Sequence, residues 1–260
     1  MTTFYNENWF FELKTPDYEI PVFGGKIAEL RLVSHNPNEY TNVEKFPLNN
    51  IEDYLIRNKI LACTFRGKED IILIQHLNDL GFKFIATYNA FMGDCNEFNE
   101  IKLRTNLKII KATENDFEGI LAVELKVFDY STFQIDPLFN NQITSLRNIL
   151  RVKSYFKNPN HITYIAKSDD KVIGFIQFVT NIEKKAAECV NGAIDPEFQG
   201  FFVGPKLYSD AFKNIFDSGI SRITGGFCTQ NIPVSKIFKA FNFKIVDQEI
   251  HLRLHTLIKQ

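Results

Sequence analysis

The chain has 260 residues, of which 45% are hydrophobic, and its 30 basic side chains nearly balance 31 acidic ones. Because no long run of one charge occurs, nothing indicates a phosphate-backbone partner, and nucleic acid is excluded as an expected partner. This length and apolar content allow one large domain or two of ordinary size, and we favour two.

The N-terminus and the cysteines indicate the compartment. The stretch MTTFYNENWF lacks the basic region and apolar core of a signal peptide, and no segment reaches the ~20 uninterrupted apolar residues of a membrane helix. We therefore expect a soluble, cytoplasmic protein with no membrane partner. The cysteines lack C-x-x-C spacing and a nearby His, which favours free thiols and no metal site. They are Cys63, Cys95, Cys189 and Cys228.

The clearest unit of the first hundred residues is DIILIQHLNDLGFKFIATYNAF, residues 70–91. Leu73 and Leu77 have helical spacing after a capping Asp70, and Gly81 is placed to end the helix before a β-rich run. Near the C-terminus, VSKIFKAFNFKIV repeats this order, with Asn242 where Gly81 stood. An internal duplication and a chance similarity explain this echo equally well.

The polar segment at residues 93–105 has no apolar period and is the best linker candidate, so we expect domains at 1–100 and 106–260. The class is α+β, or mixed α/β. From residue 107 we expect a strand, helices at 114–127 and 141–156, a hairpin at 161–179, a third antiparallel strand at 186–195, a helix carrying Leu207, Tyr208, Ala211, Phe212, Ile215 and Phe216, a strand at 221–227, and the final helix and strand.

The stretch IDPEFQGFFVGPKLYSDAF, residues 194–212, places Gly200 and Gly204 just before a helix. A phosphate-binding loop would explain this spacing, because the first N–H groups of a helix have no intrahelical acceptor. An ordinary strand-to-helix turn would explain it too.

The order of elements around this loop resembles the GNAT superfamily of N-acetyltransferases, whose pattern is Q/R-x-x-G-x-G/A. The chain keeps Gln199 and Gly204 but has Phe202 at the middle glycine. The resemblance implies a GNAT-type fold, with a mostly antiparallel central sheet flanked by helices, and acetyl-CoA as co-substrate. It implies a coenzyme site formed by Ile194, Gln199, Gly200, Phe201, Phe202, Val203, Gly204 and Asn231, although Asn231 would serve equally well as a plain helix cap.

A narrower resemblance concerns YSTFQIDP, residues 130–137, which is similar to a stretch of the dTDP-fucosamine (nucleotide amino-sugar) acetyltransferases. In that family a smaller GNAT-like N-terminal domain precedes the catalytic one. Thr132 replaces an Arg, so any anion contact made by that Arg is missing. The resemblance implies acceptor contacts by Tyr130, Ser131, Phe133 and Asp136.

Acetyl transfer requires a donor to the thioester oxygen and a base for the amine. The resemblance assigns the donor to a backbone N–H at residues 191–194, beginning at Asn191, where Gly192 either marks a bulge or only relieves packing. Glu188 on the same strand is the candidate base, with Asp136 and His161 as rivals. A lone Glu on a strand is also often a solvated outward residue.

The expected general acid is missing, since Phe238 stands where the superfamily often has a Tyr, and Phe has no proton to give. Either another group protonates the leaving thiolate, or the thiolate leaves unassisted. We expect an acetyl-CoA-dependent N-acetyltransferase acting on a small primary amine, with a nucleotide-linked amino sugar as one option. The alternative is a non-catalytic GNAT-fold module that binds an acyl-CoA or a partner. Whether the chain forms a homodimer is left open.

Overall fold

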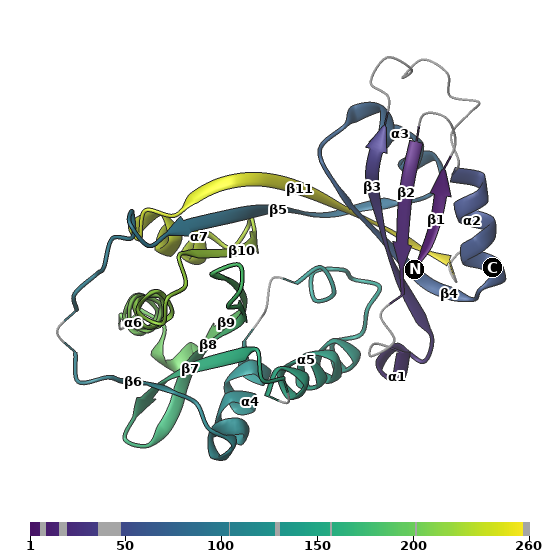
Figure 1. Ribbon diagram of the computed structural model, residues 1–260. Coiled ribbons are helices and arrows are strands. Elements are labelled where there is room, and N and C mark those ends of the chain that lie inside the picture. Colours follow the sequence, from purple (N-terminus) through teal and green to yellow (C-terminus); the bar gives the residue numbers. More distant parts are fainter. Residues whose placement is uncertain are drawn as a thin grey trace. The chain divides into compact units, whose positions relative to one another are not determined.

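The computed structural model describes residues 1–5, 9–15, 20–35, 48–103, 105–127, 131–156, 158–200 and 202–256 (Figure 1). The chain divides into two compact units, one made of Met1–Tyr88 and Gln248–Gln260 and the other of Asn89–Asp247. Within the described residues, no helix is long and apolar enough to cross a membrane.

The first unit is a sheet of strands with three helices, α1 (Ile20–Phe23), α2 (Leu48–Arg57) and α3 (Ile71–Asp79). Its first three strands form an antiparallel meander, and the fourth runs parallel to the third after the α2 crossover. The strand order is β1 (Thr2–Tyr5), β2 (Trp9–Lys14), β3 (Lys26–His35), β4 (Ile60–Gly67) and the last half of β11 (Lys244–His255).

The second unit repeats this plan. Its strand order is β5 (Lys83–Asp94), β10 (Arg222–Cys228), β9 (Ala186–Ile194), β8 (Lys171–Asn181), β7 (His161–Ser168) and β6 (Lys108–Lys111), and its helical elements are η4 (Glu114–Asp116), α4 (Phe117–Lys126), α5 (Asn141–Phe156), η5 (Pro196–Phe198), α6 (Val203–Asp217) and α7 (Ile232–Ala240). Strands β7, β8 and β9 are antiparallel, whereas β9 and β10 are parallel and joined by α6.

The sheet of the second unit has a core on each face. Val172 and Phe175 of β8 pack with α4 and α5, while Ile173 and Ile176 pack with α6 and α7. Successive strand residues point to opposite faces, so the apolar run of β8 indicates a strand that is covered on both sides. The mixed α/β class with a sheet flanked by helices is confirmed.

Several local signals are confirmed. Asp70 caps α3, where its carboxylate accepts a hydrogen bond from the N–H of Leu73 at 3.0 Å. Gly81 has φ +95° and Asn242 has φ +63°, so both helix–strand units turn through the left-handed conformation. The helix expected at 114–127 begins instead with a 3-10 turn, because Asp116 accepts hydrogen bonds from the backbone and hydroxyl of Thr113.

The unit boundaries differ from the expected 1–100 and 106–260. The last half of β11 belongs to the first unit because it pairs with β4, from Ile250 with Gly67 to His255 with Ala62. The last part of β5 belongs to the second unit, beside β10. Strand β5, which follows α3, thus ends in the second unit, and strand β11, which follows α7, ends in the first unit. Two contiguous domains could not describe this arrangement.

The segment expected as a linker packs within the second unit. The N–H of Ile101 donates to the Ser209 hydroxyl at 3.0 Å, and the Asn99 side chain donates to the carbonyl of Ala240 at 2.9 Å. Phe98 packs against the core beside α6. The segment is polar because it lies on the surface, and its contacts fasten it to that unit.

Candidate active site

The parallel strands β9 and β10 pair with each other over only part of their length. Their paired register runs from Ala186 with Arg222 to Cys189 with Gly225, although β9 continues to Ile194 and β10 to Cys228. Beyond these paired residues, the backbone groups of β9 that face β10 have no ladder partner there. The sheet therefore opens at its parallel pair, next to the start of the glycine loop.

A β-bulge precedes this opening. Phe178 of β8 pairs with Cys189 and Gln177 pairs with Asn191, so Val190 is the extra residue of β9. The expectation that Gly192 marks the bulge is wrong, because Gly192 pairs in regular register with Ile176. A β-carbon at Gly192 would lie 2.8 Å from the hydroxyl oxygen of Tyr208, which explains the glycine.

The loop after β9 begins at a buried carboxylate. Asp195 is 1% exposed, its Oδ1 accepts from the N–H of Glu197 at 3.2 Å, and its Oδ2 accepts from Lys126 Nζ at 2.9 Å. Burial opposes ionisation of Asp195, but the hydrogen bonds from Lys126 and Glu197 and the charges of Lys126 and Lys171 outweigh it and lower the pKa. The carboxylate therefore stays ionised and holds the turn.

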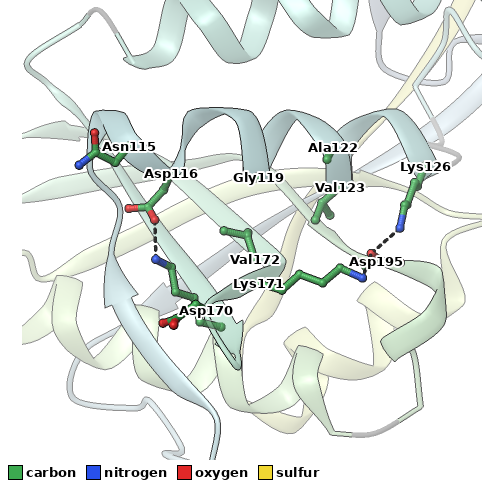
Figure 2. Close-up of a pocket in the computed structure, with 11 residues that line it drawn as sticks. Asn115, Asp116, Gly119, Ala122, Val123, Lys126, Asp170, Lys171, Val172 and Asp195 are labelled. Atoms are coloured by element: carbon green, nitrogen blue, oxygen red, sulfur yellow. Dashed lines mark hydrogen bonds and ion pairs between the residues drawn. The ribbon is translucent and has the colours of Figure 1, made fainter.

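A cavity of about 360 Å³ beside α4 contains this carboxylate, and Lys126 and Lys171 reach toward Asp195 in it (Figure 2). The Nζ atom of Lys171 lies 3.8 Å from Asp195. At the other end of the cavity, Lys167 lies 2.7 Å from Asp116. These cations are already paired with carboxylates, so we assign the cavity to support of the loop.

The glycine loop folds back on its own strand. The Gln199 side chain donates to the carbonyl of Ile194 at 3.2 Å. Gly200 has φ +86°, and a β-carbon there would meet no atom within 4 Å, so open space lies beside this backbone. Phe201 lies outside the described residues.

Phe202 has φ +59°, a left-handed conformation that non-glycine residues rarely adopt, at the position where the resemblance has glycine. Its side chain is 62% exposed. The backbone at position 202 therefore has the left-handed conformation that a glycine would adopt easily, and in Phe202 this conformation is strained.

In the first turn of α6, few backbone N–H groups donate a hydrogen bond. Pro205 has no N–H, and the N–H of Lys206 donates to the carbonyl of Phe202, which leaves Val203 and Gly204 as the orphan donors of this turn. The Val203 side chain is buried. A β-carbon at Gly204 would stand 3.4 Å from Ile237, so this glycine allows α6 to approach α7 closely.

On the face covered by α4 and α5, Asn191 lies in a polar network that the sequence did not predict. Arg151 Nη2 lies 2.8 Å from Glu124 Oε1, and the Asn191 amide donates to Glu124 Oε2 and to Gln177 Oε1, at 3.3 Å each. Gln177 in turn donates to the hydroxyl of Thr163 at 3.1 Å. The network joins two helices to three strands beside the bulge.

Glu188 is exposed on β9 and lies within electrostatic reach of α5. Burial raises the pKa of Tyr155, the charges of Arg151 and Arg147 oppose this, and those of Glu188 and Glu124 add to it. The charged groups around Tyr155 therefore include the candidate base. Its rival His161 packs against the Tyr155 ring, with centroids 4.7 Å apart, and burial lowers the pKa of this histidine.

The predicted acceptor residues have structural contacts of their own. Asp136 is 2% exposed, and its carboxylate accepts from the N–H of Leu138 at 3.0 Å. The Ser131 hydroxyl accepts from the N–H of Gln134 at 3.3 Å, and the Phe133 ring lies 4.1 Å from the Arg147 guanidinium. Tyr130 lies outside the described residues.

Phe238 and Asn231 also have structural contacts. Phe238 is 4% exposed, and its ring lies 3.7 Å from that of Phe91, centroid to centroid, and 5.7 Å from that of Phe227. Asn231 caps α7 by accepting from the N–H of Val234 at 3.3 Å. The capping role of Asn231 is thus observed, and its contact with a pantetheine arm stays a prediction.

The sequence did not single out Glu124, Arg151 and Gln177 of the polar network around Asn191, and it indicated Tyr208 only as part of an apolar helix face. A Glu and an Arg on amphipathic helices usually indicate a solvated surface, so no sequence signal separated this pair from others. Across the described residues, no group of three or more His, Cys, Asp or Glu side chains is placed to hold a metal ion.

Residues 130–243 match the family described as acetyltransferase (GNAT) family. No curated protein matches the chain. Solved structures share the fold at low identity. A GCN5-related N-acetyltransferase from Sphaerobacter thermophilus has a TM-score of 0.70 and 7% identity, covering 96% of this chain and 77% of that chain. A functionally unknown conserved protein from Staphylococcus epidermidis has a TM-score of 0.68 and 11% identity, covering 96% and 92%.

A tandem GNAT protein from the clavulanic acid biosynthesis pathway, with a TM-score of 0.61 and 11% identity, covers 96% of this chain and 79% of that chain. The similarity in fold therefore extends over both units. Residues 130–243 are therefore similar to the GNAT acetyltransferases, a family of enzymes that uses acetyl-CoA as its donor.

Proposed function

We propose that the second unit transfers the acetyl group of acetyl-CoA to a small primary amine. The observation that carries this proposal is the opening between β9 and β10 next to the glycine loop. An extended pantetheine arm needs backbone groups without a ladder partner, and the part of β9 after Cys189 offers them toward β10.

The loop fits the diphosphate of the coenzyme. Gly200 leaves its backbone uncovered, the N–H groups of Val203 and Gly204 have no intrahelical acceptor, and the N-terminus of α6 favours a negative charge. The exposed Phe202 side chain does not have to cover these groups. We infer that residues 199–204 bind the diphosphate through their backbone.

The acceptor would approach from the face of α4 and α5. Glu188 of β9, whose charge acts on Tyr155 of α5, would receive the proton of an ammonium group there, directly or through a water molecule. Glu124, Arg151 and Asn191 form a fixed polar wall beside the bulge. A backbone N–H of β9 near Asn191 would stabilise the oxyanion that forms when the amine attacks.

The nucleotide-linked amino sugar remains one option for the acceptor. It is supported by the sequence YSTFQIDP, whose Phe133 lies against Arg147 of α5. This guanidinium is a candidate for the anion contact that Thr132 cannot make. Phe238 favours the second candidate function, a non-catalytic module that binds acyl-CoA, because this ring has no proton to donate.

Mass spectrometry of acetyl transfer separates the two. The purified chain is incubated with acetyl-CoA and amino acids, polyamines, arylalkyl amines, amino sugars and nucleotide-linked amino sugars, each supplied separately. We expect a product that is heavier than at least one amine by about 42 Da, the mass that an acetyl group adds when it replaces a hydrogen. Binding of acetyl-CoA without any acetylated amine would establish the binding module instead.

A further inference from the structure

Tyr208 brings a hydroxyl group to the opening between the strands. Its side chain is 6% exposed, and its oxygen lies 2.8 Å from the point where a β-carbon on Gly192 would stand. Gly192 is three residues beyond Cys189, the last residue of β9 that pairs with β10. The close approach excludes any side chain at position 192, so the strand and the tyrosine fit each other.

The Tyr208 hydroxyl makes no hydrogen bond to any residue that the structure describes, and its oxygen is not fully enclosed, so it stays partly accessible although the ring is buried. Its ring neighbours are Phe212 and Phe238, both in edge-on contact with centroids 5.7 and 6.0 Å away. A phenolic hydroxyl without a protein partner can donate its proton to a bound ligand. A phenylalanine would fill the same apolar space, so packing alone does not explain this hydroxyl.

We propose that Tyr208 is the general acid of the reaction and protonates the departing sulfur of coenzyme A. This rests on the proposed acetyl transfer. Phe238 lies on α7, and its ring meets that of Tyr208 at 78°. The hydroxyl that position 238 lacks is thus supplied from the neighbouring helix α6, beside the same strand.

The step balances with the groups present. A neutral amine attacks the thioester carbonyl, the carbon–nitrogen bond forms, and the carbon–sulfur bond breaks with its electron pair on sulfur. The Tyr208 hydroxyl gives its proton to that sulfur. The nitrogen releases one proton to solvent, and the phenolate takes up one proton from solvent. Burial, with a smaller effect of Cys189, raises the pKa of Tyr208, so the hydroxyl keeps its proton at neutral pH.

The test uses Tyr208→Phe in the full chain, with Tyr164→Phe as the matched control. Tyr164 is also buried, belongs to the same apolar cluster and has a raised pKa, but it lies on β7. Thiol release from acetyl-CoA is measured with water alone and with the best amine of the acceptor panel. Calorimetry gives the affinity for acetyl-CoA, and thermal unfolding gives Tm.

We expect Tyr208→Phe to lower kcat about a hundredfold, the lower end for a general acid because a thiolate is a fair leaving group. Its affinity for acetyl-CoA and its Tm stay unchanged, since the hydroxyl makes no hydrogen bond to a described residue that the substitution could remove. The loss shrinks with 4-nitrophenyl thioacetate, whose thiolate leaves without a proton. Wild-type turnover in Tyr208→Phe would overturn this proposal alone, whereas a wild-type protein that transfers to nothing would overturn the proposed function and this step with it.

Discussion

Arg151 of α5 and Glu124 of α4 lie 2.8 Å apart, with side chains 17% and 2% exposed. Asn191 of β9 contacts both, since its carbonyl oxygen lies 3.4 Å from Arg151 Nη2 and its amide donates to Glu124. An ion pair at this depth holds the two helices and the bulged strand in one arrangement. The geometry of the face covered by α4 and α5, where the acceptor is proposed to approach, therefore depends on this contact.

Arg151→Met should lower the free energy of unfolding by about 3 kcal/mol, because it leaves the Glu124 carboxylate buried without its cation. Urea titration followed by circular dichroism measures this change. Lys213→Met is the control, since Lys213 pairs with Asp217 at the surface and its loss should have no detectable effect. Equal stability of both variants would mean that the buried pair does not hold the helices.

Asp195→Asn tests the anchor of the loop through its pH dependence. The folded pKa of Asp195 is lowered, so its ionisation contributes stability above the unfolded value of about 3.9, and this is lost as the pH falls through the folded pKa. The variant should be less stable than wild type at pH 7, with a gap that narrows toward pH 3. Tm measured across this range gives the gap.

Asp170→Asn is the matched control for Asp195→Asn, because Asp170 lines the same cavity in a left-handed turn position that Asn tolerates. Its Tm should follow wild type at every pH. If the difference in Tm between Asp195→Asn and wild type stayed constant between pH 7 and pH 3, it would contradict the conclusion that the ionised Asp195 carboxylate holds the turn.

Phe202→Gly should raise the free energy of unfolding by about 0.5 to 1 kcal/mol. It removes a left-handed strain of about 1 to 2 kcal/mol, and the greater freedom of glycine in the unfolded chain offsets part of this gain. Phe202→Ala removes the same ring but keeps the β-carbon, so it should bring no gain. The comparison fails if alanine stabilises as much as glycine, because strain would then not be the cause.

Local structure could be predicted from the sequence where the signal is itself local. The helix expected at 141–156 is α5, because its apolar residues recur at helical spacing. The left-handed residues that end α3 and α7 could be recognised from Gly81 and Asn242, the two residue types that adopt this conformation most easily.

The rest depends on long-range pairing. Glu124 and Asn191 are 67 residues apart, and only the register of β9 and the packing of α4 bring them together. The bulge at Val190 has no sequence signal, since an ordinary valine fits a regular strand equally well. The exchange of strands β5 and β11 between the units could not be predicted either, because both strands have ordinary β patterns.

The binding of acetyl-CoA at the glycine loop is the central claim, and Gly200→Asp tests it. Aspartate would place bulk and a negative charge beside the orphan N–H groups of α6, where the diphosphate is expected. Gly219→Asp is the matched control, because Gly219 has φ +93° and open space as well but follows the other end of α6.

Calorimetric titration of the three proteins with acetyl-CoA is the most direct measurement. We expect wild type and Gly219→Asp to bind alike and Gly200→Asp to lose at least about tenfold in affinity, which corresponds to about 1.4 kcal/mol. Equal affinity of all three proteins, or no binding by the wild type, would contradict the assignment of this loop to the coenzyme.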